Sequence, residues 1–427
     1  MNPFVAQYHQ EAQAYCSDLP WLATMQQQAQ RAFCQLGFPK KSDEDWKYTR
    51  VDVFNQRHFF VAANTPVQNS VINPSALGFS HGCAVNFVNG HCQSVERHSD
   101  WPADILMMPL SEALNSAQEK IQPYLNKILA QQHGFHALNT AFIGQGLFIY
   151  VPRNVRCIQP LLLSHVQQSD GSATYLRHVV VLEEHSALTI IEDYVGHHDI
   201  CYFTNSICEV NLEKNATLTH LKIQRESQRA FHIGHMAVKQ GEASTFNSHA
   251  IHVGAGIGRS DIDVRLGASA ANCLLNGIYA PMQGQHIDHH TSIWHDVPNC
   301  HSQQDYKGII EGRAVFNGRV IVAKNAQKTD AQQQNKNILL STKAEIDTKP
   351  QLEIFADDVV CSHGATVGQL DEDALFYLAS RGLTKDIAKL YLVKAFTAKN
   401  LALLANLEWS ACVEALICQQ LGWFNDE

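Results

Sequence analysis

The residues best suited to chemistry in this sequence are a cysteine and a histidine two positions apart, Cys361 and His363. They follow residues 352–357, where apolar and acidic side chains alternate as in a half-buried strand. If the extended backbone continues, both side chains project from one face just past the last strand. Thiolate and imidazole are ligands for iron and zinc. Two ligands do not complete a metal site, so the others would come from elsewhere, for example from a second chain.

The pair also has a purely structural interpretation. A cysteine and a histidine can end a strand before a turn at Gly364, because small buried thiols commonly pack as hydrophobic residues. The residue types and their spacing do not by themselves decide between these interpretations.

A second stretch, residues 285–301, is rich in histidine and could hold zinc or iron. It lacks the HExxH spacing of a helical zinc site, and adjacent residues on a strand face opposite sides, so at most some of the rings can converge. We therefore expect structural histidines on successive coils, each with a hydrogen-bond partner. The residues concerned are His286, His289, His290, His295 and His301, beside Asp288, Asp296 and Cys300.

Nucleotide binding finds no support in the sequence. The glycines of residues 254–258 resemble a nucleotide loop, but residues 261–266 alternate like a strand where a helix would have to begin. The phosphate-loop motif GxxxxGK[ST] does not occur. Any ATPase activity associated with this chain would belong to a partner.

Composition indicates an ordinary globular protein of two or three domains, with 427 residues, 45% hydrophobic and 17% charged. A net charge of -9 without a cluster of basic residues gives no electrostatic basis for binding nucleic acid or anionic lipid. The sequence shows no secretory signal and no apolar run of the roughly 20 residues that span a bilayer, so we expect a cytoplasmic location. The 12 cysteines are scattered and match no ferredoxin spacing, which predicts reduced thiols.

Three regions are expected along the chain. Residues 1–145 form an N-terminal helical and mixed region, with helices over residues 21–36 and 111–129. Residues 146–368 consist of short β-rich runs and form the core. Residues 369–427 return to helices that begin near Asp371, Thr384 and Glu408 and could dock a partner or simply cap the core.

A loose repeat runs through the β-rich core. Polar turns lead into a small residue and then a strand at residues 184–188, 214–218, 241–244, 267–270 and 312–315. Alanines in the first four units, at positions 187, 216, 243 and 268, lie 25–29 residues apart. A period of this length in a region of strands predicts stacked coils of a β-solenoid, with a jelly-roll sandwich as the alternative.

Several short motifs, in order along nearly the whole chain, resemble the SufB/SufD family of iron–sulfur cluster assembly proteins. The most specific is Cys-Ser-His-Gly-Ala-Thr-Val-Gly at residues 361–368, followed by Leu-Phe-Tyr-Leu-Ala-Ser-Arg-Gly at residues 375–382. Shorter matches lie at residues 37–39, 44–49, 138–141, 150–152, 306–308, 314–318 and 349–354. The form of the first motif and the chain length favour the SufD branch.

The resemblance implies a right-handed parallel β-helix flanked by N-terminal and C-terminal helical regions. It implies a non-catalytic scaffold that pairs with SufB through the β-helix and binds the SufC ATPase through the C-terminal helices. By the resemblance, His363 matches a histidine that contributes to a nascent iron–sulfur cluster shared with SufB, and Cys361 matches the adjacent thiol, which would bind metal or pass on sulfur. The family's complex is also associated with reduced flavin, but no residue here matches a flavin motif.

Two rival functions are considered. A carbohydrate-active enzyme on a β-helix needs a groove of catalytic carboxylates, and the sequence shows no convincing pair. An independent metalloprotein would use the histidines of residues 286–301. A homodimer through the open edge of the β-helix is a further arrangement when SufB is absent. The cluster type, the electron donor and the recipient proteins are not encoded in a form that can be read from the sequence.

Overall fold

The computed structural model describes residues 2–64, 82–404 and 406–422. The N-terminal region contains several short helices and strands that precede the regular repeat. These are α1 (Pro3–Ala14), α2 (Pro20–Leu36), the 3-10 helices η1 (Glu44–Trp46) and η2 (Asp52–Asn55), β1 (Phe60–Val61), β2 (Cys83–Val88), β3 (His91–Arg97), β4 (Leu106–Pro109), α3 (Leu110–Ser116), α4 (Gln118–Ile121) and α5 (Gly134–Ala141).

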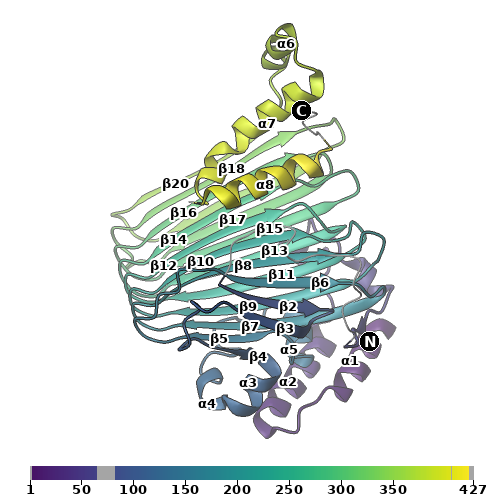
Figure 1. The fold of residues 1–427 in the computed structure, drawn as a ribbon, viewed down its shortest axis with the longest axis vertical. Coiled ribbons are helices and arrows are strands. Elements are labelled where there is room, and N and C mark those ends of the chain that lie inside the picture. Colours follow the sequence, from purple (N-terminus) through teal and green to yellow (C-terminus); the bar gives the residue numbers. More distant parts are fainter. Residues whose placement is uncertain (1, 65–81, 405, 423–427) are drawn as a thin grey trace.

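The body of the protein is a parallel β-solenoid of two facing 10-stranded sheets (Figure 1). From β5 on, successive strands alternate between the sheets, so that each strand from β7 to β18 pairs in parallel with the strands two before and two after it. The first sheet, called sheet A, has β5 (Leu147–Val151), β7 (Ser172–Leu182), β9 (Phe203–Leu212), β11 (Phe231–Gln240), β13 (Ile257–Leu266), β15 (His286–His295), β17 (Arg313–Val322) and β19 (Glu345–Ile354), with β4 at its end and β1 paired with β7. Sheet B has β6 (Leu161–Gln167), β8 (Ala187–Gly196), β10 (Thr217–Arg225), β12 (Thr245–His252), β14 (Asn272–Tyr279), β16 (His301–Ile310), β18 (Asp330–Leu339) and β20 (Val360–Gln369), with β2 and β3 at its end.

The sequence repeat corresponds to the turns that carry the chain from sheet A to sheet B. Each of these turns between β5 and β18 holds one residue with positive φ, a conformation in which the backbone reverses sharply, and the last turn, from β19 to β20, holds none. In most of them the N–H of this residue donates to a carbonyl of the next coil, as from His185 to Lys214 and from Asn215 to Glu242. The positive-φ residues are Asn154, His185, Asn215, Ala243, Ala270, Asn299 and Lys328. The unit at residues 312–315 leads into β17 of sheet A instead, which is why the spacing widens there.

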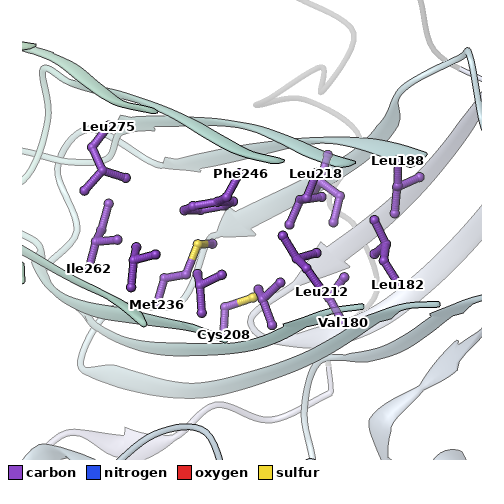
Figure 2. Packing of buried hydrophobic residues seen from close by; sticks show 14 of the residues in the cluster. Val180, Leu182, Leu188, Cys208, Leu212, Leu218, Met236, Phe246, Ile262 and Leu275 are labelled. Carbon is purple, nitrogen blue, oxygen red and sulfur yellow. The ribbon is translucent and has the colours of Figure 1, made fainter. Parts of the chain in front are cut away.

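The core lies between the two sheets and is built from side chains stacked in register. In sheet B, Leu188 pairs with Leu218, and Leu218 pairs with Phe246 in the next coil. Figure 2 shows this row facing a second row from sheet A that includes Leu212 and Met236. Full burial of each such side chain contributes about 1.5–3 kcal/mol, so the coils stabilise one another by stacking.

Helices cover the outer faces of both sheets. The α1, α2 and α5 helices pack on sheet A through an aromatic cluster that includes Phe33, Phe54 and Phe203. On sheet B, α7 (Lys385–Ala402) and α8 (Leu407–Gln420) bury Val393 and Trp409 against the strands. The α6 helix (Glu372–Ser380) extends beyond the sheets at the end of the solenoid (Figure 1).

Most of the expected helices are present with the expected boundaries. Gly37 ends α2 with φ 63°, and Asp371 and Thr384 cap α6 and α7 with their side chains. The Gly-rich residues 254–258 lead into strand β13, as expected from the alternation that follows them. None of the described helices is long and apolar enough to cross a membrane.

The single helix expected over residues 111–129 is wrong. The chain forms only the short α3 and α4 and then turns through Asn126, whose φ is 57°. The reason lies in sheet A, where the buried carboxylate of Glu209 accepts the backbone N–H groups of residues 126–129 at 2.7–3.3 Å. Four charge-assisted hydrogen bonds to a buried carboxylate outweigh the local helical pattern.

Candidate functional site

Cys361 and His363 lie on the last coil of the solenoid, in strand β20. The expectation that His363 lies past the last strand is wrong, and the extended run is also interrupted, because β19 ends at Ile354 and a turn precedes Val360. Within β20, however, the two residues alternate as expected. Cys361 pairs with the buried Ala331 and His363 with the buried Gln333 of β18, so both lie on the inner face of sheet B.

The inner face is open at this point because β20 is the last strand of sheet B among the described residues. His363, which would otherwise lie inside the solenoid, is exposed as a result. Successive residues on one face of a strand are about 6.6 Å apart, so the thiol and the imidazole of this coil are neighbours.

The Cys361 thiol is half-buried and packs against the small apolar cluster at the end of the solenoid that includes Val320 and Ala326. This burial raises the pKa of the Cys361 thiol above its ordinary value, and nearby Asp330 acts in the same direction, although a backbone hydrogen bond from Ala331 opposes them. The free side chain is therefore a thiol at neutral pH. A metal ion that binds there must displace the proton, which makes binding dependent on pH.

A groove of about 280 Å³ runs beside His363 along the final coils of sheet B. Outward-facing amide side chains of β18, those of Gln332 and Gln334, line it, whereas the side chain of His363 points to the inner face. Lys399 of α7 reaches the groove from the covering helix and forms a 2.9 Å ion pair with Asp305. The groove is thus polar and lies on the outer face of sheet B, between the final coils and the C-terminal helices.

The open end also exposes large apolar side chains. Phe355 is 62% exposed and Val360 is 68% exposed, and Val367 lies further along β20 with 48% exposure. The strands β19 and β20 each pair with only one neighbour among the described strands, so their outer edges keep unpaired N–H and C=O groups. An apolar, unpaired edge of this kind is suited to another polypeptide.

The histidines of residues 286–301 do not converge on one site. Odd and even positions of β15 face opposite sides: His289 and His295 lie inside the solenoid, while His286 and His290 lie on the outer face of sheet A. Most have a structural partner, as expected. His286 contacts Thr49 at 2.7 Å, His290 contacts Asp288 at 3.0 Å, His295 contacts Ser302 at 2.8 Å and His301 contacts Asp330 at 3.3 Å.

A different group of histidines, which the sequence reasoning missed, does converge. His133 and His136 flank the first turn of α5, and His235 lies 99 residues further on in β11. The only signal in the sequence is the spacing of three between the first two, which places them on one side of a helix.

These features define a class of protein, a parallel β-solenoid closed by helices on both faces and open at its last coil. The family model for the SUF system FeS cluster assembly SufBD core domain matches residues 165–396, and that for the SufBD protein N-terminal region matches residues 2–163. The chain belongs to the SufB/SufD family of iron–sulfur cluster assembly proteins.

Individual relatives agree with this assignment. The chain is 32% identical to the iron–sulfur cluster assembly protein SufD of Escherichia coli over 87% of both chains. A SufBD family protein of Synechocystis is 31% identical over 85% of this chain and 83% of its own length. The SufD protein of Bacillus subtilis is 26% identical over 69% of each chain.

Proposed function

We propose that this protein is a scaffold subunit of a SufB–SufC–SufD-type complex in which iron–sulfur clusters are assembled and handed on. The observation that carries this proposal is the open last coil, which presents Cys361 and His363 on an unpaired β-edge beside exposed apolar residues. In this proposal the cluster is the cargo of the complex and is held only transiently.

The partner at this edge is a SufB chain, joined through the two solenoids. Cys361 and His363 supply one part of the coordination and the SufB chain supplies the rest, because iron in such clusters needs more ligands than two side chains provide. Neutral imidazole binds iron through a ring nitrogen, and the thiol binds after losing its proton. Exposure of His363 is required for this role, since a ligand shared between two chains has to be reachable from outside.

The second partner is the SufC ATPase, which docks on the C-terminal helices. The α6 helix supports this assignment because it has no buried residue and carries Phe376, 76% exposed, and Tyr377, 57% exposed. This chain itself is proposed to be non-catalytic and to act in the cytoplasm, with ATP hydrolysis confined to SufC. We assign no residue to flavin.

Co-expression with the SufB and SufC proteins of the same organism tests the proposal. We expect a stable complex after anaerobic purification, in which iron and acid-labile sulfide are bound, whereas this chain alone contains neither cluster iron nor sulfide. Absence of a complex would overturn the scaffold assignment. A homodimer of the isolated chain that dissociates when SufB is added is compatible with it, because both assemblies would use the same edge.

A further inference from the structure

Three imidazoles meet on the outer face of sheet A, far along the chain from the open last coil. His133 immediately precedes α5, His136 lies in its first turn, and His235 points outward from β11 beneath it. One ring nitrogen from each lies within 4.8 Å of the other two. On β13, Asp261 lies directly beside His235 in register, and its carboxylate is 3.9 Å from Nδ1 of that histidine.

The hydrogen bonds of this group fix the protons on two of the rings. The backbone N–H of Gln132 donates to Nδ1 of His136 at 3.2 Å, so the neutral ring carries its proton on Nε2. That Nε2–H donates to Nδ1 of His235 at 2.9 Å. The proton of His235 is then on Nε2, which faces a carboxylate oxygen of Asp263 at 3.2 Å. A second-sphere carboxylate on the far nitrogen is the usual arrangement around a metal-binding histidine.

The ring nitrogens of His133 have no comparable hydrogen bonds in the described part of the chain. Both of its ring nitrogens are buried, and neither has a hydrogen-bond partner in the described part of the chain. The ring makes an edge contact with Trp46 at 5.1 Å and a tilted contact with His136 at 3.7 Å between ring centroids. One of its unpaired nitrogens lies within 4.8 Å of a ring nitrogen of His136 and of His235, so it can share a ligand with them. Such a ligand would satisfy a buried polar atom that is otherwise unpaired.

We propose that His133, His136 and His235 bind a borderline divalent metal ion such as Zn²⁺, with water in the fourth position. Three imidazoles and a water molecule are a known donor set for this class of ion. On binding, the ion takes the place of the proton between His136 and His235, that proton moves to Nδ1 of His136, and the amide of Gln132 turns away. The two rings separate slightly, because nitrogens on one tetrahedral ion are about 3.3 Å apart.

The surroundings fit this assignment in charge and in access. Burial lowers the pKa of His133 and His136 well below the ordinary value, so both rings are neutral and able to bind metal at neutral pH. Burial acts the same way on His235, but the carboxylates of Asp263 and Asp261 outweigh it and raise the pKa, so an ion that binds there competes with a proton. The nearby cation Arg259 is already paired with Asp261 at 2.9 Å and Asp288 at 3.2 Å. An open groove of about 250 Å³, lined in part by His235 and Asp261, leads to the group and gives an ion a path of entry.

Titration of the purified full-length chain with Co²⁺ tests the proposal, because tetrahedral Co²⁺ has intense visible absorption and substitutes for Zn²⁺. The titration is made at pH 7.5 on metal-free protein carrying Cys361→Ser and His363→Ala, so that the last coil cannot contribute. We expect one Co²⁺ per chain, displaced by Zn²⁺. Adding His133→Ala should weaken binding by about 100-fold or more. A matched control, His249→Asn on the outer face of sheet B, should leave binding unchanged.

Two results would overturn the proposal: no Co²⁺ or Zn²⁺ bound at micromolar concentrations by folded protein, or stoichiometric binding that survives His133→Ala. Since His235 is nearly fully buried, His235→Asn is used only if its thermal unfolding matches that of the parent. His133 is less buried than His235, so His133→Ala is expected to fold and tests the proposal even if His235→Asn does not fold. Neither result depends on the SufB or SufC partners, so the outcome is separate from that of the proposed function.

Discussion

Replacing His363 with alanine separates a role in cluster assembly from a role in folding. The side chain is exposed on the last coil, so its loss should change the free energy of unfolding by no more than about 0.5 kcal/mol. For a chain of this size that corresponds to about 1 °C or less in the unfolding midpoint. Loss of a metal ligand has a far larger effect on metal affinity, about tenfold or more.

The assay is the iron and sulfide content of the complex with SufB and SufC, purified anaerobically, for the wild-type and His363→Ala chains. The matched control is His301→Ala, another partly exposed histidine two strands away in the same sheet. We expect full complex formation in all three and a cluster content reduced by about tenfold only in His363→Ala. Insoluble protein would show that His363 is structural. Equal cluster loss in both variants, or none in either, would refute the shared-site reasoning.

Three further outcomes are expected. The double change Phe376→Ala and Tyr377→Ala in α6 should weaken binding of the SufC ATPase at least about tenfold in a pull-down titration while SufB binding persists, because neither side chain is buried in the fold; unchanged SufC affinity would move the docking site elsewhere. Arg259→Met leaves two buried carboxylates without their cation and should lower the free energy of unfolding in urea by about 3–5 kcal/mol. Arg319→Met breaks an exposed ion pair and should lower it by at most about 1 kcal/mol. Similar losses in the two variants would contradict the larger role of the buried ion pair. Burial, together with His220, lowers the pKa of His249 from 6.5 to about 4, so the unfolded chain takes up a proton that the folded chain does not, and the contribution of His249 to stability should fall from pH 6.5 to pH 4 and change no further below that. Between these two values His249→Gln should reduce the slope of stability against pH by about one proton, and an unchanged slope would exclude this histidine as a cause.

Removing residues 384–427 is a less specific test of SufC docking than the substitutions on α6, although the docking proposal predicts that it abolishes SufC binding and spares pairing with SufB. Because α7 and α8 bury Val393 and Trp409 on sheet B, this deletion would uncover apolar strand residues such as Ile223 and Ile251. Substitutions on α6 avoid that exposure and are the cleaner test of docking.

Local sequence patterns determined much of this protein. Caps at Asp371 and Thr384 and the stop at Gly37 placed helix ends, because capping depends on a few neighbouring residues. The repeated turns predicted stacked coils, because in most coils the backbone reverses sharply at the same position. Cys361 and His363 share a face because they lie two residues apart in one strand, although the alternation of residues 352–357 ends in the preceding strand β19.

Only the tertiary structure decided the features that depend on residues far apart in the chain. Four amides after α4 bind Glu209, about 80 residues away, and so end a helix that the local pattern favours. His133 and His136 meet His235 because α5 lies across sheet A, and no local spacing encodes that contact. Stacked strands bring together residues that are one coil apart, and this regular separation leaves a repeat in the sequence that can be predicted. Packing of the helical regions joins residues at any separation. The contacts of Glu209 and of the three histidines therefore leave no such pattern.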